Sequence, residues 1–178
     1  AAIFACKEAV RTNLRALSVI FNDEKMAEKN GLEAKHRREV IKGLFLLTPA
    51  VSSTFASFNN TFKELLNGDI GMLLIDEAGQ ANLTNALGAL LRSKMAVVVG
   101  DPLQLEPVVT LPVSLNNAIL SYCEAKEEFN LLKSSVQLRA DKAQNIGTYI
   151  KGSGESIWVG SPLIVHRRCA NPMFEISN

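Results

Sequence analysis

Apolar residues at the start of the chain recur at helical spacing. Five of them are separated by seven, four, three and four positions, which places them on one face of a helix. They are Ile3, Val10, Leu14, Leu17 and Phe21. The pattern predicts a packed helix over residues 1–21. Residues 22–42 alternate in charge, so we expect a solvated loop and an exposed helix there.

Three short apolar runs follow, at 44–47, 72–75 and 95–99. Each is too short for a helix and too uniformly apolar for a half-exposed strand, so we interpret them as strands buried on both faces of a sheet. Helix-like stretches lie between them at 61–66 and 83–92. This alternation predicts an α/β fold with a parallel sheet and right-handed crossovers.

The rest of the chain carries weaker patterns. We expect a helix over 115–129, then loops or a small insertion in a glycine-containing polar region, and a short strand at 163–165. Ligands of parallel α/β sheets bind beyond the carboxyl ends of the strands. The residues directly after each apolar run are therefore the candidates for chemistry.

Composition excludes several classes of protein. The chain has 178 residues, is 47% hydrophobic and carries a formal net charge of +1. This composition argues against wholesale disorder. The net charge gives no sign of a nucleic-acid, membrane or acidic partner, so any such site must be local. Three scattered cysteines do not make a disulfide framework or a closed zinc site. No apolar run has the length of a membrane span. We expect a cytoplasmic protein.

Two adjacent carboxylates end the second apolar run. Asp76 and Glu77 follow the strand predicted at 72–75, where Mg²⁺ held through a carboxylate and waters would offset their charge beside a nucleotide phosphate. Asp76 would then hold the water shell of the metal, and Glu77 would deprotonate the attacking water. The alternative, that both are turn or capping acids, is equally compatible with this segment alone.

The third apolar run is followed by a glycine and a polar turn. Gly100 lets the backbone turn tightly, and Asp101 comes next. Gln104 carries a neutral amide that both donates and accepts hydrogen bonds, so it could report whether a γ-phosphate is present. Taken alone, the Gly-Asp-Pro sequence is only a good turn.

Together these segments resemble a known family. DEAGQA at 76–81 and GDPLQLEP at 100–107 resemble motifs II and III of superfamily 1 helicases, in the branch of the nonsense-mediated-decay RNA helicase and its bacterial relatives. TPAVSSTFA at 48–56 looks like the loop of that family that meets single-stranded nucleic acid. VHRRCANP at 165–172 is similar to motif IV, whose arginine falls on Arg168.

The resemblance implies a RecA-like P-loop NTPase core that uses ATP and Mg²⁺. In that core Asp76 serves Mg²⁺, Glu77 is the catalytic base, and Gln104 and Arg168 sense the γ-phosphate. Further residues that the resemblance places near the nucleotide are Gln80, Gly100 and Asp101.

The same resemblance implies that single-stranded DNA or RNA meets the hydroxyl loop, by which we mean Ser52, Ser53 and Thr54. Hydroxyls suit a sugar-phosphate backbone that is bound without regard to sequence, and the fork of an arginine suits phosphate. Structural roles remain open for single residues: turn or cap hydroxyls for Ser53 and Thr54, and a surface ion pair for Arg168.

One departure from the family matters. A P-loop ATPase wraps the phosphates with a glycine-rich loop ending in Gly-Lys-Ser/Thr, and this sequence has no Gly-Lys dipeptide. We therefore expect a fragment that is inactive in isolation and works with the remainder of its own polypeptide. Its parts would be a helical segment at 1–43, a partial first RecA-like domain at 44–160 with an insertion after 110, and the start of a second at 161–178.

Three functions remain open. The first is the ATPase segment of a helicase. The second is a non-catalytic module that binds single-stranded nucleic acid. The third is an unrelated Mg²⁺-binding regulatory domain, in which Asp76 would be phosphorylated. An incomplete sheet would also expose strand edges, so we expect self-association.

Overall fold

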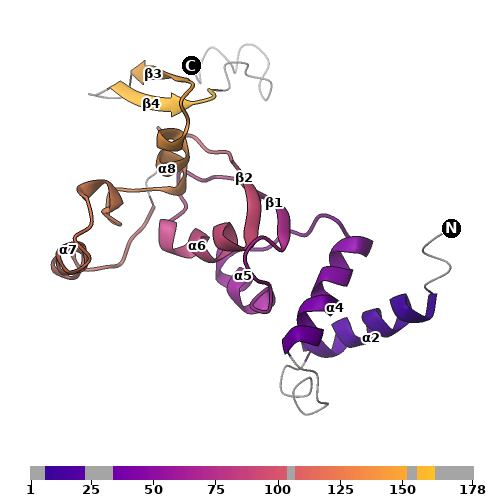
Figure 1. Cartoon of the computed structure of the whole chain (residues 1–178). Coiled ribbons are helices and arrows are strands. Elements are labelled where there is room, and N and C mark those ends of the chain that lie inside the picture. The colour runs from indigo at the N-terminus through magenta and orange to yellow at the C-terminus, as the bar shows by residue number, and fades with distance from the viewer. Residues whose placement is uncertain (1–6, 23–33, 104–106, 152–155, 163–178) are drawn as a thin grey trace, which may run out of the picture. The chain divides into compact units, whose positions relative to one another are not determined.

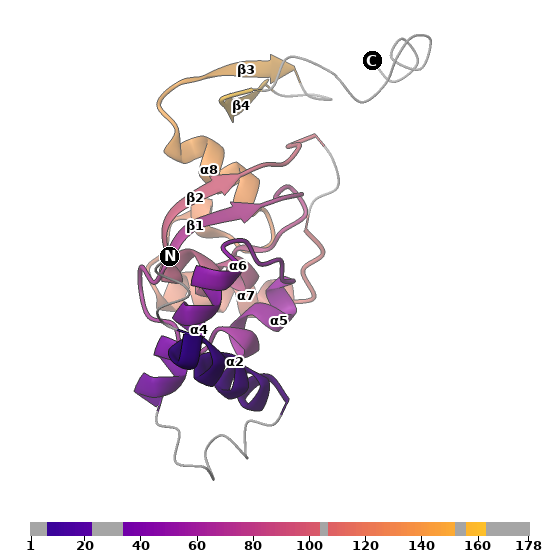
Figure 2. The same cartoon turned by 90° about the vertical axis from the view of Figure 1, so that its right-hand side faces the viewer.

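The computed structural model describes residues 7–22, 34–103, 107–151 and 156–162, which form two compact units (Figures 1 and 2). Unit 1 runs to Ile75 and resumes over Leu83–Val97, and unit 2 holds Asp76–Asn82 and the chain from Val98 onward. The content is mixed helix and strand with a small parallel sheet, so the α/β prediction is confirmed at this level.

In its described residues, unit 1 has two helices that pack on each other, a third short helix, and then a strand, a helix and a strand. The elements are α2 (Lys7–Asn22), α4 (Ala34–Leu47), α5 (Phe55–Thr61), β1 (Ile70–Ile75), α6 (Leu83–Arg92) and β2 (Ser93–Val98). Strands β1 and β2 pair directly, with α6 as the crossover between them. The helix at 83–92 and the strand at 72–75 are thus confirmed, the strand predicted at 95–99 is confirmed as far as Val98, and the N-terminal helix is confirmed from Lys7, since residues 1–6 lie outside the described residues.

The core of unit 1 lies between the helices and one face of this sheet. Its buried cluster is joined by partly buried Phe45, Ile70 and Leu73. The cluster consists of Ile41, Phe58, Phe62, Leu65 and Ala89. Aromatic rings fill its centre, with the Phe62 centroid 5.1 Å from Phe58 and 5.9 Å from Phe45. Offset aromatic packing of this kind adds to the stability that apolar burial provides.

Two sequence predictions about unit 1 are wrong. Residues 44–47 are not a strand but the last turn of α4, because Ile41 and Phe45 recur at helical spacing and both pack into the core. The helix predicted at 61–66 is α5, which ends at Thr61. Helix α5 starts earlier than predicted because Thr54 caps its N-terminus.

The prediction that the strands are buried on both faces is also wrong. Four apolar side chains of β1 and β2 are between 39% and 70% exposed. They are Met72, Leu74, Met95 and Val97. On β1, Ile70 and Leu73 pack against the helical core of unit 1, whereas four successive residues of β2, 94–97, are exposed.

The described residues of unit 2 form two helices, a short 3-10 turn and a hairpin. They are α7 (Val113–Tyr122), η1 (Glu127–Phe129), α8 (Val136–Ala143), β3 (Gly147–Lys151) and β4 (Ser156–Gly160). The helix predicted at 115–129 is α7, which ends seven residues earlier. Strands β3 and β4 pair antiparallel with Tyr149 opposite Trp158, and the hairpin packs on α8 (Figure 1).

The polar region after residue 130 therefore differs from the loops expected there. Its signal was weak because α8 buries polar side chains, among them Gln137 and Asp141, so no apolar stripe marks the helix. The strand predicted at 163–165 lies outside the described residues. No helix in the described ranges is long and apolar enough to cross a membrane.

Candidate functional site

The acidic loop, residues 76–82, leaves the end of β1. Asp76 and Glu77 are exposed, and the Glu77 amide donates to Oδ1 of Asp76 at 3.0 Å. Glu77 has a φ of 53°, a left-handed conformation that costs a residue with a side chain roughly 1 kcal/mol. Strain of this kind concentrates at functional sites because the surrounding structure must maintain it.

The Gly-Asp-Pro turn, residues 100–102, packs against the acidic loop through backbone contacts. The Ala78 amide donates to the carbonyl of Val99 at 3.0 Å. A Cβ atom on Gly79 would lie 2.6 Å from the Asp101 carbonyl, and one on Gly100 would lie 2.7 Å from the Gly79 amide nitrogen. Glycine is required at both positions, because a side chain on either residue would prevent the two loops from approaching so closely.

The N-terminus of α8 holds the other side of the acidic loop. The first amides of a helix have no partner within the helix, and here the Val136 amide donates to Ala81 O at 3.0 Å and the Gln137 amide to Ala78 O at 3.1 Å. Ser135 caps the helix by accepting from the Leu138 amide. Sequence reasoning missed this contribution, although a serine directly before Val136 is an N-cap signal.

The structure thus brings part of the predicted site together in unit 2. Asp101 is exposed, and its Oδ1 accepts from the Leu103 amide at 2.9 Å, which fixes the turn after Gly100. Gln80 is exposed on the acidic loop, and its backbone N–H donates to the Glu77 carbonyl at 3.0 Å. Gln104 and Arg168 lie outside the described residues.

The residues present suit a magnesium ion bound through waters. The Asp76 side chain is exposed and one of its oxygens is engaged by a backbone amide, so its orientation is set while lone pairs remain for a hydrated cation. Among the described residues no group of three His, Cys, Asp or Glu side chains gathers as a metal cage. Mg²⁺ does not need such a cage when it keeps several waters.

The hydroxyl loop belongs to unit 1 and connects α4 to α5. Ser52, Ser53 and Thr54 are exposed and line an open pocket of about 450 Å³ together with Val51 and neighbouring α5 residues. Oγ1 of Thr54 accepts from the Ser57 amide at 3.3 Å, so the cap role left open for this residue is observed. The Ser53 hydroxyl donates to the Thr54 carbonyl at 3.2 Å.

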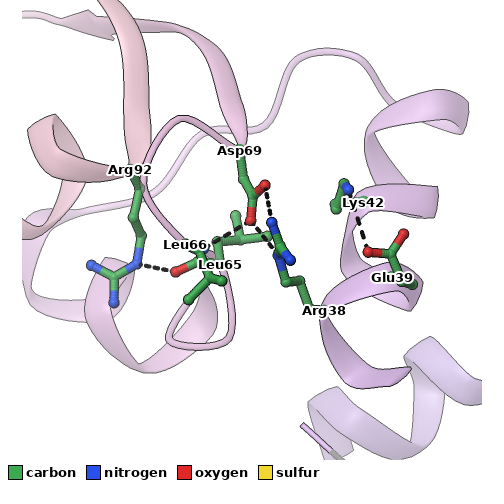
Figure 3. A network of polar contacts seen from close by, with 7 residues as sticks. All are labelled: Arg38, Glu39, Lys42, Leu65, Leu66, Asp69 and Arg92. Atoms are coloured by element: carbon green, nitrogen blue, oxygen red, sulfur yellow. Dashed lines mark hydrogen bonds and ion pairs between the residues drawn. The ribbon is translucent and has the colours of Figure 1, made fainter. Parts of the chain in front are cut away.

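A partly buried ion pair between Arg38 and Asp69 fixes the turn that precedes β1 (Figure 3). Nε and Nη2 of Arg38 donate to the two carboxylate oxygens of Asp69 at 2.6 and 2.7 Å, and the Leu66 amide donates to Oδ2 at 2.8 Å. Hydrogen bonding by Arg38 lowers the pKa of Asp69 from 3.8 to about 2. Arg92 secures the same turn by donating to the Leu65 carbonyl at 2.9 Å.

Comparison with known proteins gives one finding. A family model described as an AAA domain matches residues 11–112, which is more than half of the chain. The matched range includes the hydroxyl loop, the acidic loop and the Gly-Asp-Pro turn. No curated protein and no solved structure matches the chain.

Proposed function

The chain belongs to the AAA domain family with helicase-like character, and from this premise we propose that it is part of the ATPase motor of a superfamily 1 helicase of the nonsense-decay-helicase-like branch. The observation that carries the proposal is the junction in unit 2. There the acidic loop and the Gly-Asp-Pro turn are held backbone to backbone, with the carboxylates of Asp76, Glu77 and Asp101 exposed beside it.

The proposed roles follow from the chemistry of the side chains. Asp76 orients the waters of a bound Mg²⁺, which would neutralise charge on the β- and γ-phosphates. Glu77 accepts the proton of the attacking water. Gln104 and Arg168 sense the γ-phosphate, and Gln80, Gly100 and Asp101 complete the nucleotide side of the site.

The hydroxyl loop is proposed to contact single-stranded DNA or RNA. Its exposed hydroxyls and the pocket beside them support this role, since such groups bind a sugar-phosphate backbone without reading sequence. Movement along the strand or unwinding of a duplex would be coupled to ATP hydrolysis. We place the protein in the cytoplasm on its cysteine usage.

The phosphate-binding loop of this motor would come from elsewhere in its polypeptide, because the sequence contains no Gly-Lys dipeptide. In this proposal residues 1–43 are a helical segment, residues 44–160 are part of the first RecA-like domain, and residues 161–178 start the second. Without the donors of the phosphate loop, positioning and charge stabilisation of the transition state should collapse.

ATP turnover with Mg²⁺ tests the proposal. We would compare this chain with the longer polypeptide that the proposal requires, each with and without a single-stranded oligonucleotide. The longer protein should hydrolyse ATP, faster with the strand, and Glu77→Gln should reduce kcat at least about a hundredfold. This chain alone should show no turnover.

Glu124→Gln is the matched control. Glu124 is also exposed and also has a positive φ, of 49°, but it lies after α7 and carries no proposed role. Its variant should hydrolyse ATP at the wild-type rate. Wild-type turnover by Glu77→Gln in the longer protein would overturn the proposal.

A further inference from the structure

Helix α8 buries two polar side chains one turn apart. Gln137 is 5% exposed and Asp141 is 2% exposed, and Nε2 of Gln137 donates to Oδ1 of Asp141 at 3.0 Å. The same Oδ1 accepts from the Gly160 amide at 3.0 Å. The other two acceptors, Oε1 of Gln137 and Oδ2 of Asp141, are buried without a hydrogen-bond partner among the described residues.

Burying this pair lowers the stability of the fold relative to an apolar pair, if the helix serves only to pack against its neighbours. A buried carboxylate needs its oxygens satisfied, and an unpaired buried acceptor weakens the fold. A pair of apolar side chains of the same size would serve packing better. Buried polar groups without hydrogen-bond partners occur mainly at functional or strained sites. We therefore expect a role for this pair within unit 2.

One end of the pair reaches the β3–β4 hairpin. The Trp158 indole N–H donates to the Asp141 carbonyl at 3.0 Å, and Gly160 donates to the Asp141 side chain. Both donors belong to β4, which packs on α8 in both views of the molecule (Figures 1 and 2). Asp141 therefore fixes the hairpin to the helix through its backbone and its side chain.

The other end of the pair reaches the acidic loop and the Gly-Asp-Pro turn. The Gln137 amide donates to the Ala78 carbonyl, one residue after Glu77. Oε1 of Gln137 lies 3.0 Å from the position that a Cβ atom on Gly100 would occupy. A shift of Gln137 must therefore be accommodated by both loops, because they already touch each other.

We infer that Gln137 and Asp141 are positioning residues that tie the β3–β4 hairpin to the acidic loop. Displacement of the hairpin is passed through Asp141 and Gln137 to the backbone of Ala78, and from there to Asp76 and Glu77. The inference rests on the proposed function only for the consequence that the two acids act on a nucleotide. The mechanical connection itself is a property of unit 2.

Hydrogen exchange of this chain tests the connection directly. Trp158→Phe removes the indole hydrogen bond to the Asp141 carbonyl, a residue outside the acidic loop. It should speed exchange of the Ala78 and Ala81 amides by about tenfold, a change equivalent to 1.4 kcal/mol of local opening. Gln137→Met should do the same, while amides of α5 in unit 1 should not change.

Lys142→Gln is the control, because Lys142 lies on the same helix but is exposed. It should leave exchange in the acidic loop unchanged. If Trp158→Phe alters exchange in the hairpin alone, or if Gln137→Met leaves the Ala78 amide protected, the connection does not exist. Circular dichroism of each variant verifies that it is folded. Asp141→Asn is a milder change than Trp158→Phe or Gln137→Met, because an asparagine keeps an acceptor for the Gly160 amide.

A second readout separates this inference from the proposed function. In the longer polypeptide, Trp158→Phe should lower kcat several-fold with little change in KM for ATP, because the acids are displaced while the nucleotide is still bound. If exchange responds but Glu77→Gln leaves turnover intact, the ATPase proposal fails and the connection stands. If Glu77 is essential but exchange does not respond, only the connection fails.

Discussion

Glu77 shows how much the site depends on a single backbone conformation. Its positive φ is strained for any residue with a Cβ atom, and glycine would adopt it freely. Glu77→Gly should therefore be more stable than Glu77→Gln by about 1 kcal/mol, although both lack the carboxylate. Urea denaturation of the two variants measures the difference, and equal midpoints would show that the residue is unstrained.

Asp69 makes stability depend on pH. Its pKa is lowered to about 2 in the folded state, so its ion pair with Arg38 contributes fully above about pH 4 and is lost as the pH falls toward 2. We expect a loss of the order of 1 kcal/mol over this range. Asp69→Asn should remove this pH dependence.

The control for Asp69 lies in the same view (Figure 3). Glu39 pairs with Lys42 at 3.3 Å, but the Glu39 side chain is 57% exposed. Solvent screens such a pair, so Glu39→Gln should unfold with the wild-type profile. A profile for Asp69→Asn that still falls between pH 4 and 2 would assign the effect to other carboxylates.

At the scale of elements, the junction of the acidic loop with the Gly-Asp-Pro turn can be tested with a methyl group. Gly79→Ala would place a Cβ atom 2.6 Å from the Asp101 carbonyl oxygen. This clash can be relieved only if the backbone of one of the two loops moves. Destabilisation of about 1–3 kcal/mol is expected. Gly71→Ala in β1 is the matched control, because no atom lies within 4 Å of its added Cβ, and it should unfold at or above the wild-type midpoint.

The elements also show what the sequence could reveal. Strand β1 and helix α6 were predictable because their apolar patterns match their structure. The strand predicted at 44–47 was wrong because a short apolar run at the end of a helix has the same pattern as a buried strand. Helix α8 was missed because its buried face includes Gln137 and Asp141, whose burial depends on partners distant in sequence.

The candidate site divides in the same way. Asp76, Glu77 and Gly100 could be proposed from the sequence because motif spacing is local, and the contact between their loops follows from neighbouring strands. The amides of Val136 and Gln137 could not be found by motif, since backbone groups have no sequence signature. The left-handed conformation of Glu77 was equally hidden, because glutamate does not favour it.

At the scale of the whole molecule, the exposed apolar side chains of the β1–β2 sheet predict association. Met72 and Leu74 lie on β1, Met95 and Val97 lie on the paired strand β2, and all four are exposed in the described structure. Contiguous apolar surface on a sheet favours contact with another chain. We expect this chain to self-associate at micromolar concentration, and the proposed remainder of its polypeptide would otherwise cover these side chains.

A lysine placed in the sheet tests this expectation. Leu74 is 70% exposed, so Leu74→Lys should remain folded while its charge opposes contact between copies. Sedimentation velocity should show the wild-type chain shifting to larger species with concentration and Leu74→Lys remaining a monomer. Val108→Lys is the control, because Val108 is 91% exposed but lies outside the sheet, and it should associate like wild type. A wild-type chain that sediments as a monomer at every concentration would show that the exposed apolar side chains of the sheet do not drive association.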